Sequence, residues 1–325
     1  MWLCLHLPNC ALEAATRYLP AEDAPMAVVA AERGRRRVIA VNDVARQCGV
    51  APGQWLTAAR ARAPALLALQ HDPRAQDRLL RELAARCLTY SSHVHRPDPP
   101  PEPGAGRLLL EIGASLRLFG GRARLQEMLE ENLAQAGHEV FLGAGRTPTL
   151  AMLRARAGAH GQRVTKTHRL PLVLLELPPA TLESLTAAGL TTVGEVLALS
   201  RAAVGHRYGP DCLSYLDRLT GRAPDPRPAL AWPQRFAVKL ELSAEAIDTQ
   251  ALGFVLERLV TDLGAALRGA DAAVVALHLT LEHAGRTPTR VNLGFTAPTS
   301  DPARITSLLA TRLDTQQLPA PERAL

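Results

Sequence analysis

Residues 106–121, GRLLLEIGASLRLFGG, decide the fold of the first half of the chain. The apolar run from Leu108 to Ile112 predicts a buried strand, because a short apolar segment bounded by turn residues is typical of a strand inside a sheet. The glycines that follow predict a turn and the start of a helix. Glu111 is the single acid of this stretch. We therefore place a buried strand here and assign its neighbours outward from it.

Alternating and helical spacings on either side extend this strand into a larger domain. Further strands are predicted over residues 2–7, 26–30, 38–41 and 138–145, and helices over 10–18, 73–90, 122–136 and 147–158. The segment HRPDPPPEPGAG at 95–106 contains five prolines and predicts a loop, because proline can neither continue a helix nor donate to a sheet. We expect a sheet with helices on one face.

The second half of the chain has a different composition. Residues 167–223 indicate short helices, residues 224–233 are proline-rich and predict a linker, and residues 234–325 indicate the order β-α-β-β-α. In the last region we expect strands over 234–243, 272–284 and 289–298, and helices over 248–268 and 302–313. The fold class that we predict is α+β, in a chain with several domains.

The charge of the chain permits a nucleic-acid partner without proving one. Its 325 residues include 37 basic and 31 acidic ones, a net charge of +6, and Lys166 and Lys239 are the only lysines. Arginine suits phosphate because its planar guanidinium donates two parallel hydrogen bonds. A GC-rich genome explains the same arginine bias equally well, so both interpretations stay open.

No apolar stretch approaches the roughly 20 residues that cross a bilayer, and the first residues lack a secretory leader. We therefore expect a soluble, cytoplasmic protein without a membrane partner. The five cysteines are scattered without a C-x-x-C pair, and the close histidine pair His93 and His95 has no acid or cysteine at ligand spacing. We expect core thiols, no metal site and no cofactor.

Three stretches resemble a known family, in the order in which that family has them. VIAVNDVARQCGVAPGQWLTAARARAP at 38–64 is similar to the fingers segment of Y-family, lesion-bypass DNA polymerases, and LGAGRTPTLAMLRARAGAHGQ at 142–162 to a segment of their palm. LTAAGLTTVGEVLAL at 185–199 resembles the second half of the helix-hairpin-helix in their thumb. The resemblance implies a palm over 1–25 and 73–165, fingers over 26–72, a thumb over 166–223, a linker over 224–233 and a βαββα little finger over 234–325.

The catalytic carboxylates of that family are missing where the resemblance places them. Such polymerases use these acids to hold two divalent ions. With Glu111 aligned on the last acid of the family's run, Gly106 and Arg107 fall on the pair of acids, and His6 falls on the acid of the first strand. Glycine cannot ligate, arginine repels a cation, and histidine is a poor magnesium ligand. We therefore expect no metal pair and no nucleotidyl transfer.

Two further positions bear on the nucleotide pocket that the resemblance implies. Ala11 stands where the family has an aromatic residue that excludes ribonucleotides, whereas Arg46 is retained. Together with the missing acids, LHLP at 5–8 and LLLEIGASLRLFGG at 108–121 are most similar to the non-catalytic, ImuB-type branch of the family.

That branch implies a DNA-binding adaptor of bacterial translesion synthesis. The partners that it implies are primer-template DNA, an error-prone C-family DNA polymerase, a RecA-like mutasome protein of the ImuA type, and the sliding clamp. These 325 residues end in QQLPAPERAL, which lacks an aromatic anchor, so we expect the clamp contact either in a tail that is absent from them or elsewhere in the protein. Two other interpretations remain: an active polymerase whose metal ligands are displaced, and a protein-interaction module without affinity for DNA.

Candidate DNA-binding residues fall in three places, of which two precede the linker. In the helix-hairpin-helix, Gly189 and Gly194 would let the backbone approach a phosphate, and Thr191 would cap the second helix. Plain helical packing explains these residues equally well. The candidates in the fingers-like segment, where an ordinary solvated surface is the alternative, are Arg35, Arg36, Arg37, Arg46, Arg60 and Arg62.

The third place is the last sheet, which strand alternation sorts into two faces. The apolar face would hold Phe236, Val238, Leu240, Val275, Leu277, Leu279, Val291, Leu293 and Phe295. The polar, mildly basic face would hold Arg235, Lys239, His278, Thr280, Arg290 and Asn292, with Glu282 as its acid. We expect the polar face to follow the backbone of a duplex, and a solvated surface is again the alternative.

Overall fold

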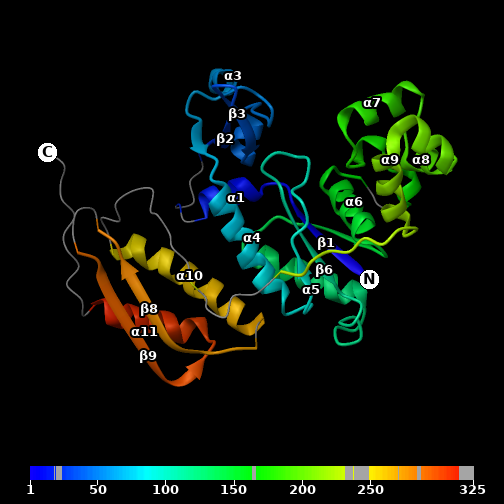
Figure 1. Ribbon diagram of the computed structural model, residues 1–325. Coiled ribbons are helices and arrows are strands. Elements are labelled where there is room, and N and C mark those ends of the chain that lie inside the picture. The colour runs from blue at the N-terminus through cyan, green and yellow to red at the C-terminus, as the bar shows by residue number, and fades with distance from the viewer. Residues whose placement is uncertain are drawn as a thin grey trace. The chain divides into compact units, whose positions relative to one another are not determined.

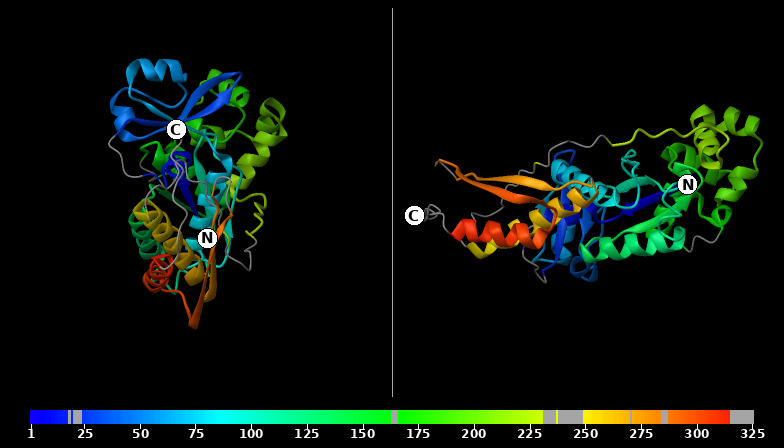
Figure 2. Two further views of the ribbon diagram at one scale, coloured as in Figure 1. Left: turned by 90° about the vertical axis from the view of Figure 1, so that its left-hand side faces the viewer. Right: turned by 90° about the horizontal axis from the view of Figure 1, so that it is seen from below.

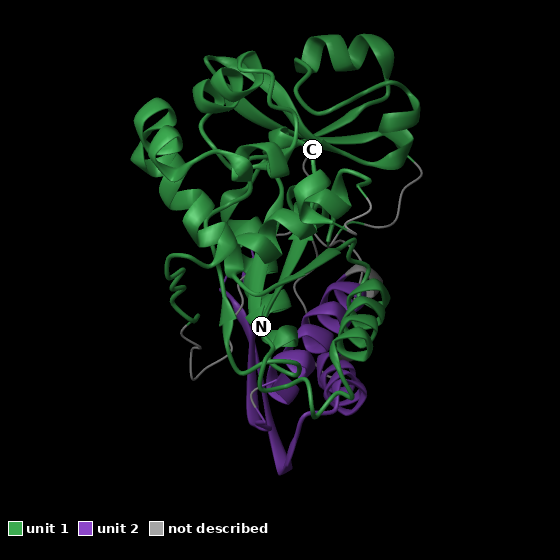
Figure 3. Cartoon of the chain, turned by 90° about the vertical axis from the view of Figure 1, so that its right-hand side faces the viewer, with its two compact units in different colours: residues 1–230 green, residues 231–325 purple. Residues whose placement is uncertain are grey.

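The computed structural model describes residues 1–17, 19, 24–162, 166–230, 237, 249–269, 271–283 and 287–314. The chain divides into two compact units, Met1–Leu230 and Ala231–Leu325 (Figure 3). Among the described residues, no helix combines the length and the apolar character that a bilayer-spanning segment requires.

The first unit is built on a four-stranded sheet with the strand order β5-β6-β1-β7 (Figure 1). Its strands are β1 (Trp2–Leu7), β5 (Val94–His95), β6 (Gly106–Glu111) and β7 (Phe141–Gly145). β1 pairs antiparallel with both β6 and β7. The strand predicted from the apolar run is confirmed as β6. The helices connected to these strands are α1 (Cys10–Thr16), α4 (Pro73–Cys87), α5 (Arg122–Gln135) and α6 (Pro148–Ala159).

Helices cover both faces of this sheet, so the prediction of one covered face is wrong. On one face, a Cβ added to Gly106 would meet Cys10 of α1 and Leu80 of α4. On the other face, Cys4 and Leu109 belong to the same core cluster as small residues of α6. Figure 1 shows α4 and α6 on either side of β1. Alanines and glycines allow α6 to approach the sheet closely, and such small residues give only a weak apolar pattern.

A second, three-stranded sheet with the order β3-β2-β4 lies between α1 and α4 in the sequence. Its elements are β2 (Met26–Glu32), β3 (Arg35–Val41), α2 (Asp43–Gln47), α3 (Leu56–Arg62) and β4 (Leu67–Gln70). β2 and β3 form the predicted hairpin. Its two turn residues, Arg33 and Gly34, have φ values of 49° and 76°, the left-handed geometry that fits the twist of a two-residue hairpin.

Residues 166–221 form a helical module that packs on α6. Its elements are η1 (Thr167–Arg169), η2 (Leu172–Leu174), α7 (Pro179–Ala187), α8 (Val193–Ala198) and α9 (Arg201–Thr220). The leucine-rich core of the module includes Leu153 and Ala157 of α6. α9 bends at Gly209, where φ is 86°, because Pro210 cannot donate its backbone hydrogen bond.

The residues that follow this module are fixed on the first unit. Asp225 accepts hydrogen bonds from the amide and the hydroxyl of Thr149 at the start of α6, at 2.9 and 2.7 Å. The amide of Leu230 donates to the carbonyl of Val94 at 2.8 Å, and Ala229 pairs with His95 of β5. The described residues of the predicted linker, up to Leu230, therefore pack with the first unit.

The second unit contains α10 (Thr249–Gly269), β8 (Val274–Leu281), β9 (Thr289–Thr299) and α11 (Pro302–Asp314). β8 and β9 pair antiparallel, and Figure 2 shows this ribbon beside α10 and α11. One core cluster joins residues of both helices and both strands. The strand predicted over 234–243 lies outside the described residues except for Ala237, and so do Arg235, Phe236, Val238, Lys239 and Leu240.

The apolar face of the β8–β9 sheet differs from the prediction at one position. The predicted residues Leu277, Leu279, Val291, Leu293 and Phe295 belong to the core cluster. Val275, however, is 60% exposed, and Val274 packs in the cluster instead. The register of the pairing shifts between Val274 and Ala276, and such an irregularity breaks the alternation of side chains. A prediction that assumes strict alternation of side chains along the strand could not locate this shift.

Candidate functional site

The structure brings together two of the three positions at which metal-binding acids are expected. His6 of β1 and Arg107 of β6 are directly opposite each other in the antiparallel pair. Their side chains therefore project from the same face of the sheet. His6 is 2% exposed and Arg107 is 5% exposed. A buried imidazole and a buried guanidinium thus lie where the resemblance places two carboxylates.

The third position, Gly106, faces the other side of the sheet. Successive residues of a strand point to opposite faces, and Gly106 immediately precedes Arg107. A Cβ at Gly106 would lie 2.7 Å from Sγ of Cys10 and 3.0 Å from Cδ2 of Leu80. The glycine therefore permits the close approach of α1 and α4. A carboxylate here would enter the core and would not join the group of His6 and Arg107.

Three acceptors hold the guanidinium of Arg107. Its Nε donates to the carbonyl of Asp98 at 2.5 Å, its Nη2 donates to the carbonyl of Pro99 at 3.3 Å, and its Nη1 forms an ion pair with Glu176. Asp98 and Pro99 belong to the proline-rich loop, and Glu176 follows η2 in the helical module. A buried charge must be paired in this way, because its desolvation costs several kcal/mol, on the order of 5.

A second buried arginine, Arg156 of α6, lies near the same group. Its Nε donates to Oε1 of Glu102 at 2.5 Å, and its Nη1 donates to the carbonyl of Leu174 at 2.6 Å. Nε2 of His160 is 3.1 Å from the same oxygen of Glu102. Burial alone would raise the pKa of Glu102, but the hydrogen bonds from Arg156 and His160 lower the pKa overall. Glu102 is therefore an ionised partner of these two side chains at neutral pH.

His6 is neutral in this environment. Burial lowers its pKa from 6.5 to about 4, because the charged imidazolium loses its hydration. The carboxylate of Glu102 opposes this shift, and the cationic groups of Arg107 and Arg156 add to it.

These side chains do not suit a pair of divalent metal ions. Magnesium prefers hard oxygen donors, whereas His6 offers the nitrogen atoms of a neutral ring and Arg107 offers a cationic guanidinium. The nearby carboxylates of Glu102 and Glu176 are already paired with arginines. Within the part of the chain that the structure describes, no three His, Cys, Asp or Glu side chains converge on a point that could hold a metal ion.

A tryptophan that the sequence analysis did not single out organises the arginines of the β2–β3 hairpin. Arg35 and Arg37 alternate with Arg36 along β3, and their guanidinium carbons lie 5.7 and 4.9 Å from the ring centre of Trp55. Arg37 also forms a 3.1 Å ion pair with Glu32. An aromatic residue close to an arginine-rich turn is the signal that could have found Trp55, because this combination binds single-stranded nucleic acid in other proteins.

The other three predicted arginines of this region are exposed. Arg46 lies on α2 and forms an ion pair with Asp43, the first residue of the same helix. Arg60 and Arg62 lie on α3, and the guanidinium of Arg62 reaches the carbonyl of Ala58 at 3.5 Å. The structure therefore places all six arginines in one small domain, and their contact with DNA stays a prediction.

The turn between α7 and α8 differs from the predicted phosphate site. Gly189 has the positive φ of 81° that the turn requires. The cap of α8 is Thr192 and not Thr191, because the hydroxyl of Thr192 accepts the amide of Glu195. Oε2 of Glu195 in turn accepts the amides of Thr191 and Thr192, at 2.7 and 2.9 Å. The donors expected to meet a phosphate therefore hold a carboxylate of the chain itself.

Gly194 has a packing role in α8. A Cβ at this position would lie 2.7 Å from the carbonyl oxygen of His168 in η1. Any larger residue would separate the two elements, so the helical-packing alternative accounts for this glycine.

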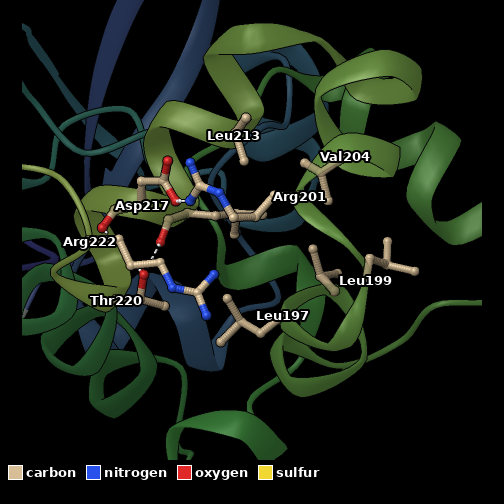
Figure 4. Close-up of a pocket in the computed structure, with 10 residues that line it drawn as sticks. Leu197, Leu199, Arg201, Val204, Leu213, Asp217, Thr220 and Arg222 are labelled. Atoms are coloured by element: carbon tan, nitrogen blue, oxygen red, sulfur yellow. Dashed lines mark hydrogen bonds and ion pairs between the residues drawn. The ribbon is translucent and has the colours of Figure 1, made fainter.

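A pocket lies between α8 and α9 of the same module (Figure 4). Its apolar wall consists of Val196, Leu197, Leu199, Val204, Leu213 and Leu216, and its polar residues are Arg201, Asp217, Thr220 and Arg222. Arg201 and Asp217 form an ion pair at this pocket. Asp217 is the only acid of the lining, and its pairing with Arg201 leaves the pocket without a free general base.

The polar face of the second unit is exposed as expected. His278 is opposite Asn292 in the β8–β9 pair, with Nδ1 and Oδ1 2.7 Å apart, and Thr280 is opposite Arg290. All four residues are exposed. Their contact with DNA stays a prediction, and the other two members of the predicted face, Arg235 and Lys239, lie outside the described residues.

Comparison with known proteins identifies the fold. The stretch from α1 to α6 matches the impB/mucB/samB family over residues 10–156. This match covers less than half of the 325 residues, so it describes this stretch alone. The chain is also 30% identical over 277 residues to Protein ImuB from Caulobacter vibrioides, in strains NA1000 / CB15N and ATCC 19089 / CIP 103742 / CB 15. The alignment covers 82% of this chain and 58% of these relatives, so the chain spans less than two thirds of their length.

Solved structures agree with this assignment. DinB from Sulfolobus solfataricus superposes with a TM-score of 0.51 at 13% identity, over 98% of this chain and 95% of that one. The insertion ternary complex of Dbh DNA polymerase gives a TM-score of 0.53 at 12% identity, over 97% of this chain and 93% of that one. The impB/mucB/samB stretch is thus part of an ImuB homologue with the mixed α/β fold of Y-family DNA polymerases, and the resemblance found in the sequence is confirmed.

Proposed function

We propose that this chain is a non-catalytic, DNA-binding adaptor of bacterial translesion synthesis. The observation that carries the proposal is the pair of His6 and Arg107, two buried nitrogen-bearing side chains at positions where a polymerase needs carboxylates. Without hard oxygen donors at these positions, the fold has no place for the metal ions of nucleotidyl transfer. The chain would then hold a primer-template without extending it.

Cations at the surface of both units, exposed except for the half-buried Arg37, support the DNA-binding part of this proposal. Arg35, Arg36 and Arg37 follow one another on β3, and Trp55 offers a ring on which a base could stack. Arg290 lies on the open face of the second unit. Such cations bind phosphates without regard to sequence, which suits a protein that must act wherever DNA is damaged.

The partners are proposed from the likeness to ImuB. We infer that the chain recruits an error-prone C-family polymerase to damaged DNA, together with a RecA-like protein of the ImuA type and the sliding clamp. The proposed location is the nucleoid. Co-elution of the purified chain with each of these three proteins, with and without primer-template DNA, would test the assembly. Separate elution of the chain from all three proteins under both conditions would contradict it.

Two measurements on one preparation test the central proposal. Fluorescence anisotropy with a labelled primer-template should show binding that weakens steeply with salt. Primer extension with magnesium or manganese should give no product above that of a matched blank. Extension above the blank would favour the alternative, an active polymerase with displaced ligands. Absence of DNA binding at low salt would favour a protein-interaction module.

A further inference from the structure

The proline-rich loop of residues 96–105 packs against the group of His6 and Arg107. This loop, RPDPPPEPGA, joins β5 to β6 and contains five prolines. Each proline fixes its own φ, so the loop loses little conformational entropy when it is ordered. A segment of this composition can therefore hold one conformation without a sheet or helix of its own.

The last residues of the loop contact α1, α4 and the β2–β3 hairpin. The carbonyl of Gly104 accepts the amide of Ala11 at 2.8 Å. A Cβ on Gly104 would lie 3.1 Å from Cβ of Ala11 and 3.4 Å from Cδ1 of Ile39, which belongs to β3. Gln76 of α4 donates to the carbonyls of Gly104 and Ala105, at 3.4 and 3.0 Å. The loop therefore fills the space between Ala11 and the β2–β3 hairpin.

The first and middle residues of the loop are tied to the buried arginines. The backbone carbonyls of Asp98 and Pro99 accept hydrogen bonds from the guanidinium of Arg107, and Glu102 forms an ion pair with Arg156. The chain thus supplies its own acceptors to two cations that would otherwise attract anions.

We propose that residues 96–105 are an internal plug, which closes the end of the sheet where the resemblance places the metal ions and the nucleotide. The plug is a second barrier to polymerase chemistry, in addition to the missing carboxylates. This inference rests on the proposed function, because it explains further why such a fold would bind DNA without copying it.

Cys10 is a natural reporter of the plug. Its side chain is fully buried and interacts with Gln76, whose amide also holds Gly104 and Ala105. Burial raises the pKa of the Cys10 thiol to about 12, and only the thiolate reacts with disulfide reagents. Cys10 should therefore stay unreactive while the plug is closed. Cys87 of α4 is equally buried and reports on unfolding of the core.

The experiment uses the full chain with Cys48→Ser, which removes the exposed thiol. Glu102→Gln removes the carboxylate that pairs with Arg156 and His160. The loop should then open more often. We expect Cys10 to react with a disulfide reagent about tenfold faster, the effect of losing one hydrogen bond to a charged group, while Cys87 is unchanged. Glu127→Gln is the matched control, because it removes an exposed pair with Arg124 on α5.

Hydrogen exchange of the Ala11 amide gives a second readout, and this amide should exchange faster in Glu102→Gln than in the control. Equal rates of Cys10 labelling and of Ala11 amide exchange in the two variants would overturn the plug. A parallel rise in the labelling rates of Cys10 and Cys87 would also overturn it, because it would indicate unfolding of the core. Binding of magnesium with a deoxynucleoside triphosphate to the parent protein, measured by equilibrium dialysis, would also overturn it.

DNA anisotropy on the same proteins separates this inference from the proposed function. Faster Cys10 labelling with unchanged DNA affinity supports the plug and the adaptor together. The same labelling difference in proteins that do not bind DNA would overturn the adaptor and support the plug.

Discussion

His6 shows how a single residue changes the chemistry of a buried position. An aspartate at this place on β1 would offer an anion, whereas the buried imidazole offers a neutral ring beside the Arg107 guanidinium. The ring cannot become charged at neutral pH, because burial lowers its pKa to about 4. At the position where the resemblance places a metal ligand, this chain therefore has a neutral side chain of a packed interior.

We expect the free energy of unfolding to decrease as the pH falls from 8 to 5, in part because of His6. Its pKa is about 4 in the folded chain and 6.5 in the unfolded chain, so the unfolded state takes up the proton first. The loss from this group is about 2 kcal/mol over that range. Urea unfolding at both pH values should show a smaller loss in His6→Gln. An identical pH dependence in the two proteins would contradict the shifted pKa.

Gly106→Asp should not restore a metal site. The new side chain would start from a Cβ 2.7 Å from Sγ of Cys10, on the face of the sheet away from His6. We expect destabilisation of about 2 kcal/mol or more from overpacking, measured by urea unfolding. Manganese binding, followed by electron paramagnetic resonance, should not increase. Gly253→Asp is the control, because a Cβ there meets no atom within 4 Å.

At the scale of elements, the β2–β3 hairpin carries three consecutive arginines, two exposed and one half-buried, close to an aromatic ring. Its two-residue turn fixes the register of β3, and the alternation along the strand places Arg35 and Arg37 beside Trp55. The guanidiniums are therefore held by the ring before any ligand arrives, which reduces the entropy lost on binding.

Reversing the charge of Arg35 and Arg37 to glutamate should weaken primer-template binding at least about tenfold and reduce its salt dependence. Trp55 fluorescence should also respond less to DNA in this variant. The same reversal at Arg122 and Arg124 on α5 changes the net charge equally and should have a smaller effect. Equal losses of affinity in the two variants would show that only net charge matters.

Most elements of the fold follow from periodicity and turn chemistry, but their contacts do not. The apolar runs and proline boundaries predict β1, β6, α4 and α6 to within a few residues. The pattern misses the second covered face because α6 approaches the sheet with alanines, and it places the cap of α8 one residue early because Thr191 and Thr192 are both good caps. It also misses the shift at Val275, which depends on pairing and not on composition.

Only the part of the candidate site that lies on the paired strands β1 and β6 was predictable from the sequence. The substitutions at His6 and Arg107 can be recognised from their own segments, and β1–β6 pairing then places them opposite each other. Glu176 lies 69 residues after Arg107, and Glu102 lies 54 residues before Arg156, so no local pattern links these ion pairs. Long-range partners of buried charges are decided by tertiary packing.

At the scale of the whole molecule, the candidate DNA-binding residues belong to two separate compact units. Arg35 and Arg37 lie in the first unit, and Arg290 lies in the second. If each unit holds its own phosphates, mutations in the two units are independent and their effects on the free energy of binding should add.

We therefore expect Arg290→Glu to reduce the slope of log K against log salt by about 0.9 for each phosphate that the variant no longer neutralises. When this change is combined with the reversal of Arg35 and Arg37, the decreases in binding free energy should sum to within about 0.5 kcal/mol. Anisotropy titrations over a series of salt concentrations would measure both quantities. An unchanged slope in Arg290→Glu would remove the open face of the β8–β9 sheet from the DNA surface.

The ion pair of Arg107 with Glu176 also limits which residues position 107 can hold. An acid at this position would set two carboxylates against each other and leave the carbonyls of Asp98 and Pro99 without their donor. A single substitution to an acid would therefore meet an interior arranged around a cation. An acid would be tolerated there only together with further changes at Glu176 and in the proline-rich loop.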